Sequence, residues 1–229
     1  MQLSFDLHDP RNNDPYSEEY FANLPENSAA ISFLEKFFGQ ENFALSQFQS
    51  LILRGPDASG KTHLVNIFAK KFHAKFLKIE QISKQNLSEI FNAHQFYILE
   101  DLEKINDEEL ALHLINLAVE KKAFLLLTSK NKSEFHLKDL TSRVKNIFSL
   151  TIKDPSLKTI EILLVNYFAR RQIKVSNRII NFVSKNIERS YAAIFSAVNL
   201  IEINCRENKK NPSLQEVEEI LSLTESTQI

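Results

Sequence analysis

The octet G-P-D-A-S-G-K-T, from Gly55 to Thr62, decides how this 229-residue chain folds. It completes the pattern G-x-x-x-x-G-K-[ST], in which backbone amides surround nucleotide phosphates, the lysine reaches the β- and γ-phosphates and the last hydroxyl holds Mg²⁺. Two of the three glycines of the chain lie in this octet. An apolar run at 51–53 precedes it, and apolar residues follow it at helical spacing: Leu64, Val65, Ile67 and Phe68. We therefore expect a strand, a phosphate-binding loop and a helix in that order.

The composition is that of a globular protein without a strong charge bias. Hydrophobic residues make up 43% of the chain and include 18 phenylalanines, enough for a buried core. Lys and Arg total 28 against 29 Asp and Glu, so no net positive field favours direct DNA binding. The single cysteine, Cys205, excludes an internal disulfide. No basic leader and no uncharged run of about eighteen residues occurs, so we expect no membrane segment and a cytoplasmic location.

Strand and helix patterns alternate up to residue 154. The strands are expected at 48–53, 75–79, 96–100, 123–128 and 147–152, and the helices at 27–38, 60–72, 84–93, 106–121 and 137–145, with Gly39 ending the first. This alternation predicts an α/β fold with a five-stranded parallel sheet covered by helices on both faces. Four helical patterns follow, at 156–171, 176–187, 190–205 and 213–222. We divide the chain into an arm with an extended linker (1–19), a nucleotide-binding domain (20–154) and an all-helical lid (155–229).

Polar residues follow two of the predicted strands, and an arginine precedes a third. Glu100 and Asp101 end the apolar run from residue 96, where carboxylates can hold Mg²⁺ or orient the attacking water. After the strand at 123–128, Lys130 or Asn131 could contact the γ-phosphate, or could simply form a turn. Arg143 precedes the last strand and is either a solvated arginine or a finger that enters a neighbour's nucleotide site.

These residues resemble the AAA+ domain of the bacterial initiator DnaA, over about residues 20 to 222. The similar segments are G-K-T-H-L at 60–64, the acidic pair, L-T-S ending at Ser129, T-S-R ending at Arg143, and an N-x-x-A segment that begins at Asn27. The resemblance implies an AAA+ P-loop NTPase core with a helical lid. It also implies ADP or ATP contacts by the octet residues Gly55, Pro56, Asp57, Ala58, Ser59, Gly60, Lys61 and Thr62, and by Asn27, His63, Asn131 and the lid arginine Arg189. Thr62 and Glu100 are the expected Mg²⁺ ligands, and Asp101 and Arg143 the expected catalytic residues.

We expect no counterpart of the helix-turn-helix DNA-binding domain of DnaA after the lid, and in this respect the sequence resembles the Hda branch of the family. Its N-terminal Q-L-S-F-D-L resembles the peptide Q-L-[SP]-L-P-L that binds the DNA polymerase III β sliding clamp; the residues concerned are Gln2, Leu3, Ser4, Phe5, Asp6 and Leu7. Alternatively, this segment is a frayed terminus. The resemblance implies a regulator that docks on the clamp, contacts DNA only through it, and promotes hydrolysis of DnaA-bound ATP.

Two rival functions stay open. Glu100 stands where the family usually has aspartate, so whether the chain hydrolyses ATP itself is undecided, as is whether ADP or ATP is the resident nucleotide. A self-sufficient ATPase would resemble the helicase loader DnaC. A non-catalytic adaptor would bind DnaA or the clamp without stimulating hydrolysis. The sequence also leaves self-association open.

Overall fold

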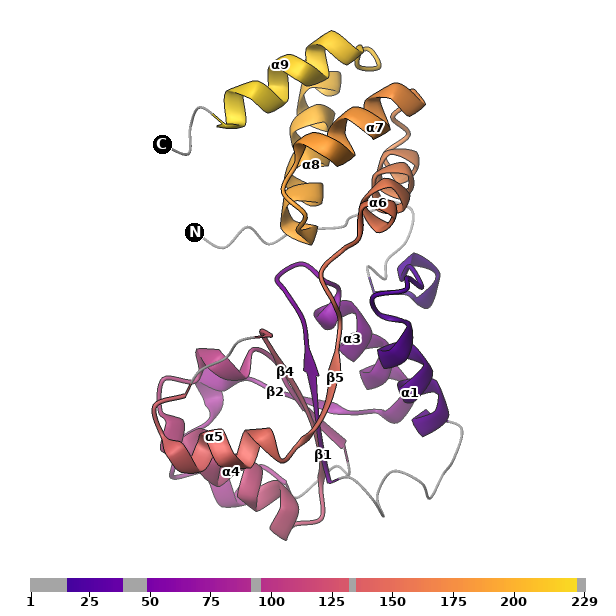
Figure 1. Cartoon of the computed structure of the whole chain (residues 1–229). Helices are drawn as coiled ribbons and strands as arrows, with labels where there is room; N and C mark the ends of the chain where they lie inside the picture. The colour runs from indigo at the N-terminus through magenta and orange to yellow at the C-terminus, as the bar shows by residue number, and fades with distance from the viewer. Residues whose placement is uncertain (1–15, 39–48, 92–95, 132–134, 226–229) are drawn as a thin grey trace. The chain divides into compact units, whose positions relative to one another are not determined.

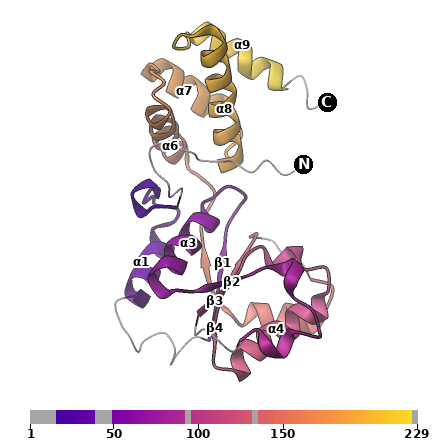
Figure 2. The same ribbon diagram turned by 180° about the vertical axis from the view of Figure 1, so that it is seen from behind.

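The computed structural model describes residues 16–38, 49–91, 96–131 and 135–225. The chain forms two compact units, an α/β unit that extends to Lys153 and a helical unit that begins at Asp154, with Asp57–Ser59 grouped with the second unit (Figures 1 and 2). No helix in these ranges is long and apolar enough to cross a membrane.

The α/β unit is built on the predicted five-stranded parallel sheet, which is confirmed. The strand order is β2-β3-β4-β1-β5, and every neighbouring pair is parallel. The strands are β1 (Ser50–Arg54), β2 (Lys75–Leu77), β3 (Phe96–Leu99), β4 (Phe124–Ser129) and β5 (Phe148–Thr151). Every residue of β4 is buried, as a central strand covered on both faces requires. Because the strands are parallel, the loops after β1, β3 and β4 emerge at one edge of the sheet.

Helices cover both faces of the sheet (Figure 1). On one face, α4 (Glu108–Glu120) and α5 (Lys138–Lys145) pack their apolar sides onto alternate strand residues such as Ile52, Leu125 and Leu127. On the other lie α1 (Ser28–Phe38) and α3 (Lys61–Phe72), where aromatic rings make much of the contact. Phe68 of α3 stacks on Phe124 with ring centroids 6.1 Å apart. The core thus holds α3, and the loop before it, rigidly against the sheet.

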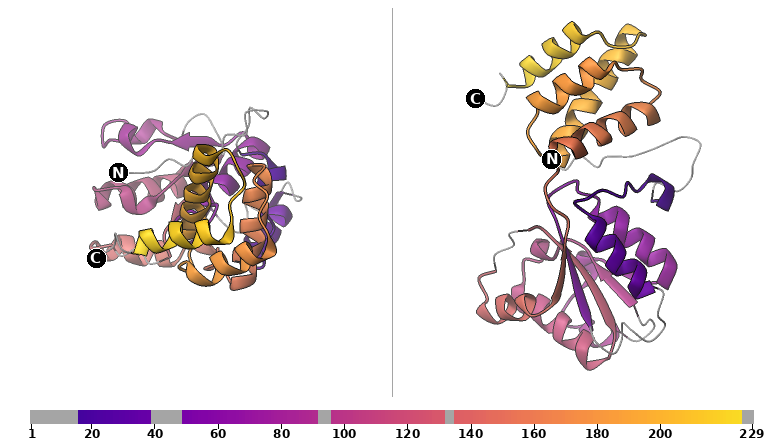
Figure 3. Two further views of the ribbon diagram at one scale, coloured as in Figure 1. Left: turned by 90° about the horizontal axis from the view of Figure 1, so that it is seen from above. Right: turned by 45° about the vertical axis from the view of Figure 1, so that its right-hand side comes forward.

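The helical unit consists of α6 (Leu157–Arg170), α7 (Asn177–Asn186), α8 (Tyr191–Asn208) and α9 (Leu214–Glu225), which Figure 3 shows in two further views. A serine hydroxyl accepts a backbone N–H at the start of each of the first three helices: Ser156, Ser176 and Ser190. Ser213 and Glu216 form a reciprocal capping box at the start of α9. The core of the unit is aliphatic, with Leu164, Val183 and Val198 fully or almost fully buried.

Two local predictions are wrong. Residues 84–91 form no α-helix; short 3₁₀ turns lie at Ile79–Gln81 and Leu87–Glu89 instead. The Asn86 side chain accepts the backbone N–H of Ser83 and donates to the carbonyl of Gln81, and such local bonds compete with helix formation. The linker is also not extended throughout, because Glu18–Tyr20 forms a 3₁₀ turn. Gly39 and residues 92–93 lie outside the described residues.

Candidate nucleotide-binding site

The loop between β1 and α3 takes a backbone conformation that depends on glycine. Gly60 is the N-cap of α3 and has φ +90°. A Cβ added there would lie 3.0 Å from Cε2 of Phe21, so the position excludes a side chain both by its backbone angles and by space. Ala58 also has a positive φ, of 59°. The octet therefore adopts a strained turn that ends at the N-terminus of a helix, where the first backbone N–H groups have no acceptor within the helix, and this is the geometry that binds phosphate.

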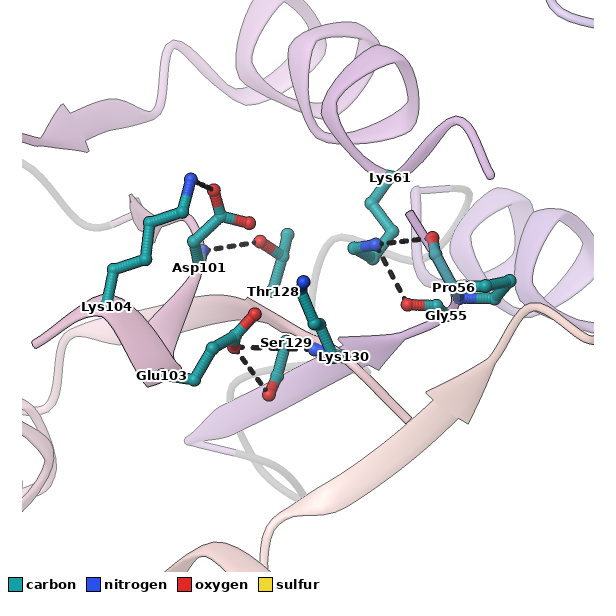
Figure 4. Close-up of polar contacts among 9 residues, drawn as sticks. All are labelled: Gly55, Pro56, Lys61, Asp101, Glu103, Lys104, Thr128, Ser129 and Lys130. Carbon is teal, nitrogen blue, oxygen red and sulfur yellow. Dashed lines mark hydrogen bonds and ion pairs between the residues drawn. The ribbon is translucent and has the colours of Figure 1, made fainter. Parts of the chain in front are cut away.

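Lys61 lies folded back over this loop. Its ammonium donates to the carbonyl oxygens of Gly55 at 2.9 Å and Pro56 at 2.8 Å, and the residue is only 8% exposed (Figure 4). A positive charge is thus concentrated beside the helix N-terminus, where the helix dipole also favours an anion.

Ser59 supports the fit of an anionic ligand to the loop. Its hydroxyl oxygen is buried and has no hydrogen-bond partner among the described residues. A buried hydroxyl in a loop of this kind is satisfied by a ligand oxygen or by ordered water. Asp57 is exposed and Ala58 and Pro56 are half-buried, so within the octet the polar groups suited to phosphate are the backbone amides, Ser59, Lys61 and Thr62.

The structure brings Glu100 next to Thr62, as a shared magnesium site requires. Burial raises the pKa of the Glu100 carboxyl above its usual range, and its hydrogen bond with the Thr62 side chain offsets this only in part. A bound cation would stabilise the charged carboxylate, so the pair fits a hard divalent ion that keeps most of its water ligands. Within the described ranges no group of three or more His, Cys, Asp or Glu side chains forms a complete metal cage.

Asp101 occupies a strained position at the same edge of the sheet. Its φ is +55°, and its N–H donates to the hydroxyl of Thr128 on β4 at 2.9 Å. Its carboxylate accepts from Lys104 at 2.5 Å. The predicted catalytic carboxylate is thus already paired with an ammonium group, which competes with other ligands for its oxygen atoms.

Sequence reasoning missed a polar cluster beside Asp101. One oxygen of Glu103 accepts from the hydroxyl of Ser129 at 2.9 Å and from the backbone N–H of Lys130 at 3.4 Å (Figure 4). The other oxygen is buried without a hydrogen-bond partner in the described part of the chain. Arg54, at the end of β1, donates to the Lys130 carbonyl at 3.4 Å; burial lowers its pKa, and the charge of Glu103 opposes this effect. Glu103 therefore anchors the turn that follows β4, the turn that was predicted to contact the γ-phosphate.

Two residues predicted to contact the nucleotide organise the backbone beside the loop. The side-chain amide of Asn27 accepts from the N–H of Leu24 and donates to the carbonyl of Ala22, each at 2.9 Å. The ring of His63 lies 2.8 Å from the carbonyl of Ser17 and packs against Phe21, with ring centroids 5.1 Å apart. Asn27 thus fixes the turn before α1, and His63 holds the preceding segment against α3. The nucleotide contacts of both residues stay a prediction.

The remaining candidates are exposed. Asn131 lies exposed after β4, and Arg189 is exposed directly before the cap of α8 in the helical unit. Arg143 lies half-exposed in the last turn of α5, and its side chain makes no hydrogen bond or ion pair with any described residue. Residues 2–7, predicted to bind the clamp, lie outside the described ranges.

Comparison with known proteins relates the chain to DnaA by sequence, although no protein-family profile matches it. It is 21% identical over 202 residues to the chromosomal replication initiator protein DnaA of Flavobacterium psychrophilum, which covers 77% of this chain and 42% of that protein. It is 22% identical over 252 residues to DnaA of Buchnera aphidicola, covering 97% and 54% respectively. An uncharacterized protein of Haemophilus influenzae is 26% identical over 228 residues, covering 87% of this chain and 97% of the other. The chain thus spans about half the length of these DnaA relatives.

Solved structures share the fold. Domain III of DnaA from Thermotoga maritima superposes with a TM-score of 0.73 at 16% identity, over 92% of this chain and 97% of that chain. DnaA bound to AMPPCP and single-stranded DNA gives 0.67 at 15% identity, over 86% and 69%. The RuvB Holliday junction branch migration motor of Thermotoga maritima gives 0.69 at 16% identity, over 91% and 72%. The chain is thus similar in sequence to DnaA, and it shares the fold of DnaA domain III.

Proposed function

We propose that the protein is an Hda-like regulator of replication initiation that binds adenine nucleotide and promotes hydrolysis of ATP on DnaA. Homology to the AAA+ region of DnaA supports a role in initiation. The observation that carries the proposal is the state of Arg143, a half-exposed arginine without a partner among the described residues, at the end of a short helix of an AAA+ fold. A guanidinium placed in a neighbour's site stabilises the charge that develops on the transferred phosphoryl group.

The chain's own nucleotide has a structural role in this proposal. The loop amides, Lys61 and the Ser59 hydroxyl would hold the phosphates of ADP or ATP, and Thr62 with Glu100 would hold Mg²⁺, which neutralises phosphate charge when bound. Two features favour slow turnover at this site. The carboxyl of Glu100 is disfavoured in its charged form by burial, and Asp101 is paired with Lys104. We infer that the protein works mainly as a nucleotide-bound partner rather than as a fast ATPase.

The partner surfaces follow from the sequence. The similarity of residues 2–7 to clamp-binding peptides supports docking on the β sliding clamp, where Gln2 would hydrogen-bond at the rim of a pocket and the apolar residues would be buried. The near-zero net charge of −1 supports contact with DNA through the clamp rather than directly. In this setting the protein acts in the cytoplasm at replicating DNA.

The test measures hydrolysis of ATP preloaded on DnaA in the presence of clamp-loaded DNA. We expect the full-length protein to accelerate hydrolysis, and Arg143→Ala to lower the accelerated rate by about 10³-fold or to the basal rate of DnaA. Lys145→Ala is the matched control, because Lys145 is an exposed cation in the last turn of the same helix. Acceleration that survives Arg143→Ala contradicts the proposed finger.

A second comparison separates the rival functions. Replacing Leu3 and Phe5 by alanine should abolish the acceleration at low protein concentration while leaving Arg143 and the nucleotide site intact. ATP hydrolysis by the protein alone that responds to single-stranded DNA, with binding to the replicative helicase, would instead favour a DnaC-like loader. Binding to DnaA or to the clamp without any acceleration would favour an adaptor.

A further inference from the structure

The helix that carries Arg143 begins without a cap of its own. Its N-cap residue, Leu137, has no side chain able to accept the free N–H groups of the first turn. The helix has only eight residues, a length at which an isolated helix is unstable in water. Leu140 and Val144 are buried in the core, and they flank Arg143 in the sequence. The position of Arg143 therefore depends on what fixes the start of α5.

A carboxylate from the neighbouring helix binds the backbone immediately before α5. Glu108 is the first residue of α4, which lies beside α5 (Figure 1). One of its oxygens accepts the backbone N–H of His136 at 3.0 Å, and the other accepts that of Leu137 at 2.5 Å. The bond to Leu137 is partly buried, whereas the bond to His136 is exposed to water.

The cap of α4 itself does not need Glu108. Asp107 is the N-cap of that helix and accepts the N–H of Leu110 at 3.0 Å. The neighbouring acid, Glu109, points elsewhere and pairs with Lys84 at 3.2 Å. Of the three acids at the start of α4, Glu108 is the one that hydrogen-bonds to the backbone at the start of α5.

We propose that Glu108 is a positioning residue for Arg143: its hydrogen bonds hold the start of α5, the helix that carries Arg143, against α4. The inference rests on the proposed function of Arg143. The two accepted backbone bonds lower the pKa of the Glu108 carboxyl, so this group is charged at neutral pH. Two bonds at one end and buried Leu140 and Val144 along the helix define its axis and rotation, and hence the direction in which Arg143 leaves it.

The test separates positioning from folding through two kinetic quantities. In the assay with DnaA preloaded with ATP, the full-length Glu108→Gln variant should lower the maximal accelerated rate about tenfold, because a small displacement of a catalytic group has effects of this size or larger. The protein concentration that gives half-maximal acceleration, and the affinity of the variant for its own nucleotide, should stay at the wild-type values. A variant that merely unfolds would lose all three. Hydrogen exchange should quicken at the amides of 137–141.

Glu109→Gln is the matched control, since it removes an equal charge from the next residue without touching α5. Suppose that Arg143→Ala abolishes acceleration, as the proposed function requires. If Glu108→Gln then has the same maximal rate as Glu109→Gln, the positioning role of Glu108 is overturned. Unchanged hydrogen exchange in α5 overturns it as well. If Arg143→Ala itself leaves acceleration intact, the proposed function fails, and the positioning role fails with it.

Discussion

Replacing Gly60 by alanine should destabilise the α/β unit and weaken nucleotide binding together. The residue has φ +90°, where an L-residue is strained by about 1–2 kcal/mol. The new Cβ would lie 3.0 Å from Cε2 of Phe21, a contact that overpacks by about a further 1–2 kcal/mol. The expected loss is therefore about 2–4 kcal/mol of unfolding free energy, or roughly a 30-fold or larger increase in the open population.

Hydrogen exchange read by mass spectrometry suits this test, because the chain has two units and bulk unfolding would mix their transitions. Peptides from β1 and α3 should exchange about 30-fold faster in Gly60→Ala, while peptides from α7 and α8 keep the wild-type rate. Adding Phe21→Ala relieves the crowding but not the backbone strain. The double variant should therefore lose about 1 kcal/mol less unfolding free energy than the sum of the losses in the two single variants. If Gly60→Ala keeps the hydrogen-exchange rates and the nucleotide affinity of the wild type, position 60 does not require glycine and the predicted strain is absent.

Three further predictions follow from the charged groups. Burial raises the pKa of the Glu100 carboxyl, so the folded state loses stability as the pH rises and this group becomes charged. Glu100→Gln should therefore have a higher melting temperature at neutral pH but lose Mg²⁺-dependent nucleotide affinity, which thermal melting and nucleotide titration with and without Mg²⁺ would measure. Glu216 has its pKa lowered to about 2, chiefly by Lys210, so its capping contribution is complete above the usual pKa of 4.5 and is lost as pH falls from 4.5 toward 2; hydrogen exchange in α9 should rise over that window in the wild type and not in Glu216→Gln. Glu103→Ala removes the hydrogen bond that the buried Ser129 hydroxyl donates to the Glu103 carboxylate and should cost about 1–3 kcal/mol, visible as faster hydrogen exchange in β4 but not in α9.

The elements that the sequence predicted well are those specified by neighbouring residues. The octet, the apolar strand before it and the apolar helix after it lie within one short segment, so β1, the loop and α3 were found in order. The five strands were placed to within two residues at most ends because their buried apolar runs are short and bounded by polar residues. The predicted helix at 84–93 failed because the Asn86 side chain bonds the local backbone in a way that periodicity does not register.

The contacts that the sequence did not predict join distant segments. Glu103 meets Ser129 because β3 and β4 are neighbours in the strand order, a fact that no local pattern contains. Glu108 reaches Leu137 across 29 positions for the same kind of reason, since α4 and α5 share one face of the sheet. In the sequence alone, both glutamates look like ordinary acidic residues in a charged stretch. Only the arrangement of strands and helices brings them to Ser129 and Leu137.

The most direct test of a trans-acting Arg143 is a single-turnover measurement of phosphate release from DnaA preloaded with ATP, with this protein saturating and the sliding clamp loaded on DNA. We expect wild-type protein to accelerate the release, and Arg143→Ala, at the same concentration and with nucleotide bound, to leave DnaA at its unassisted rate. Equal acceleration by the two proteins, or no acceleration by the wild type, would contradict a trans-acting role for Arg143.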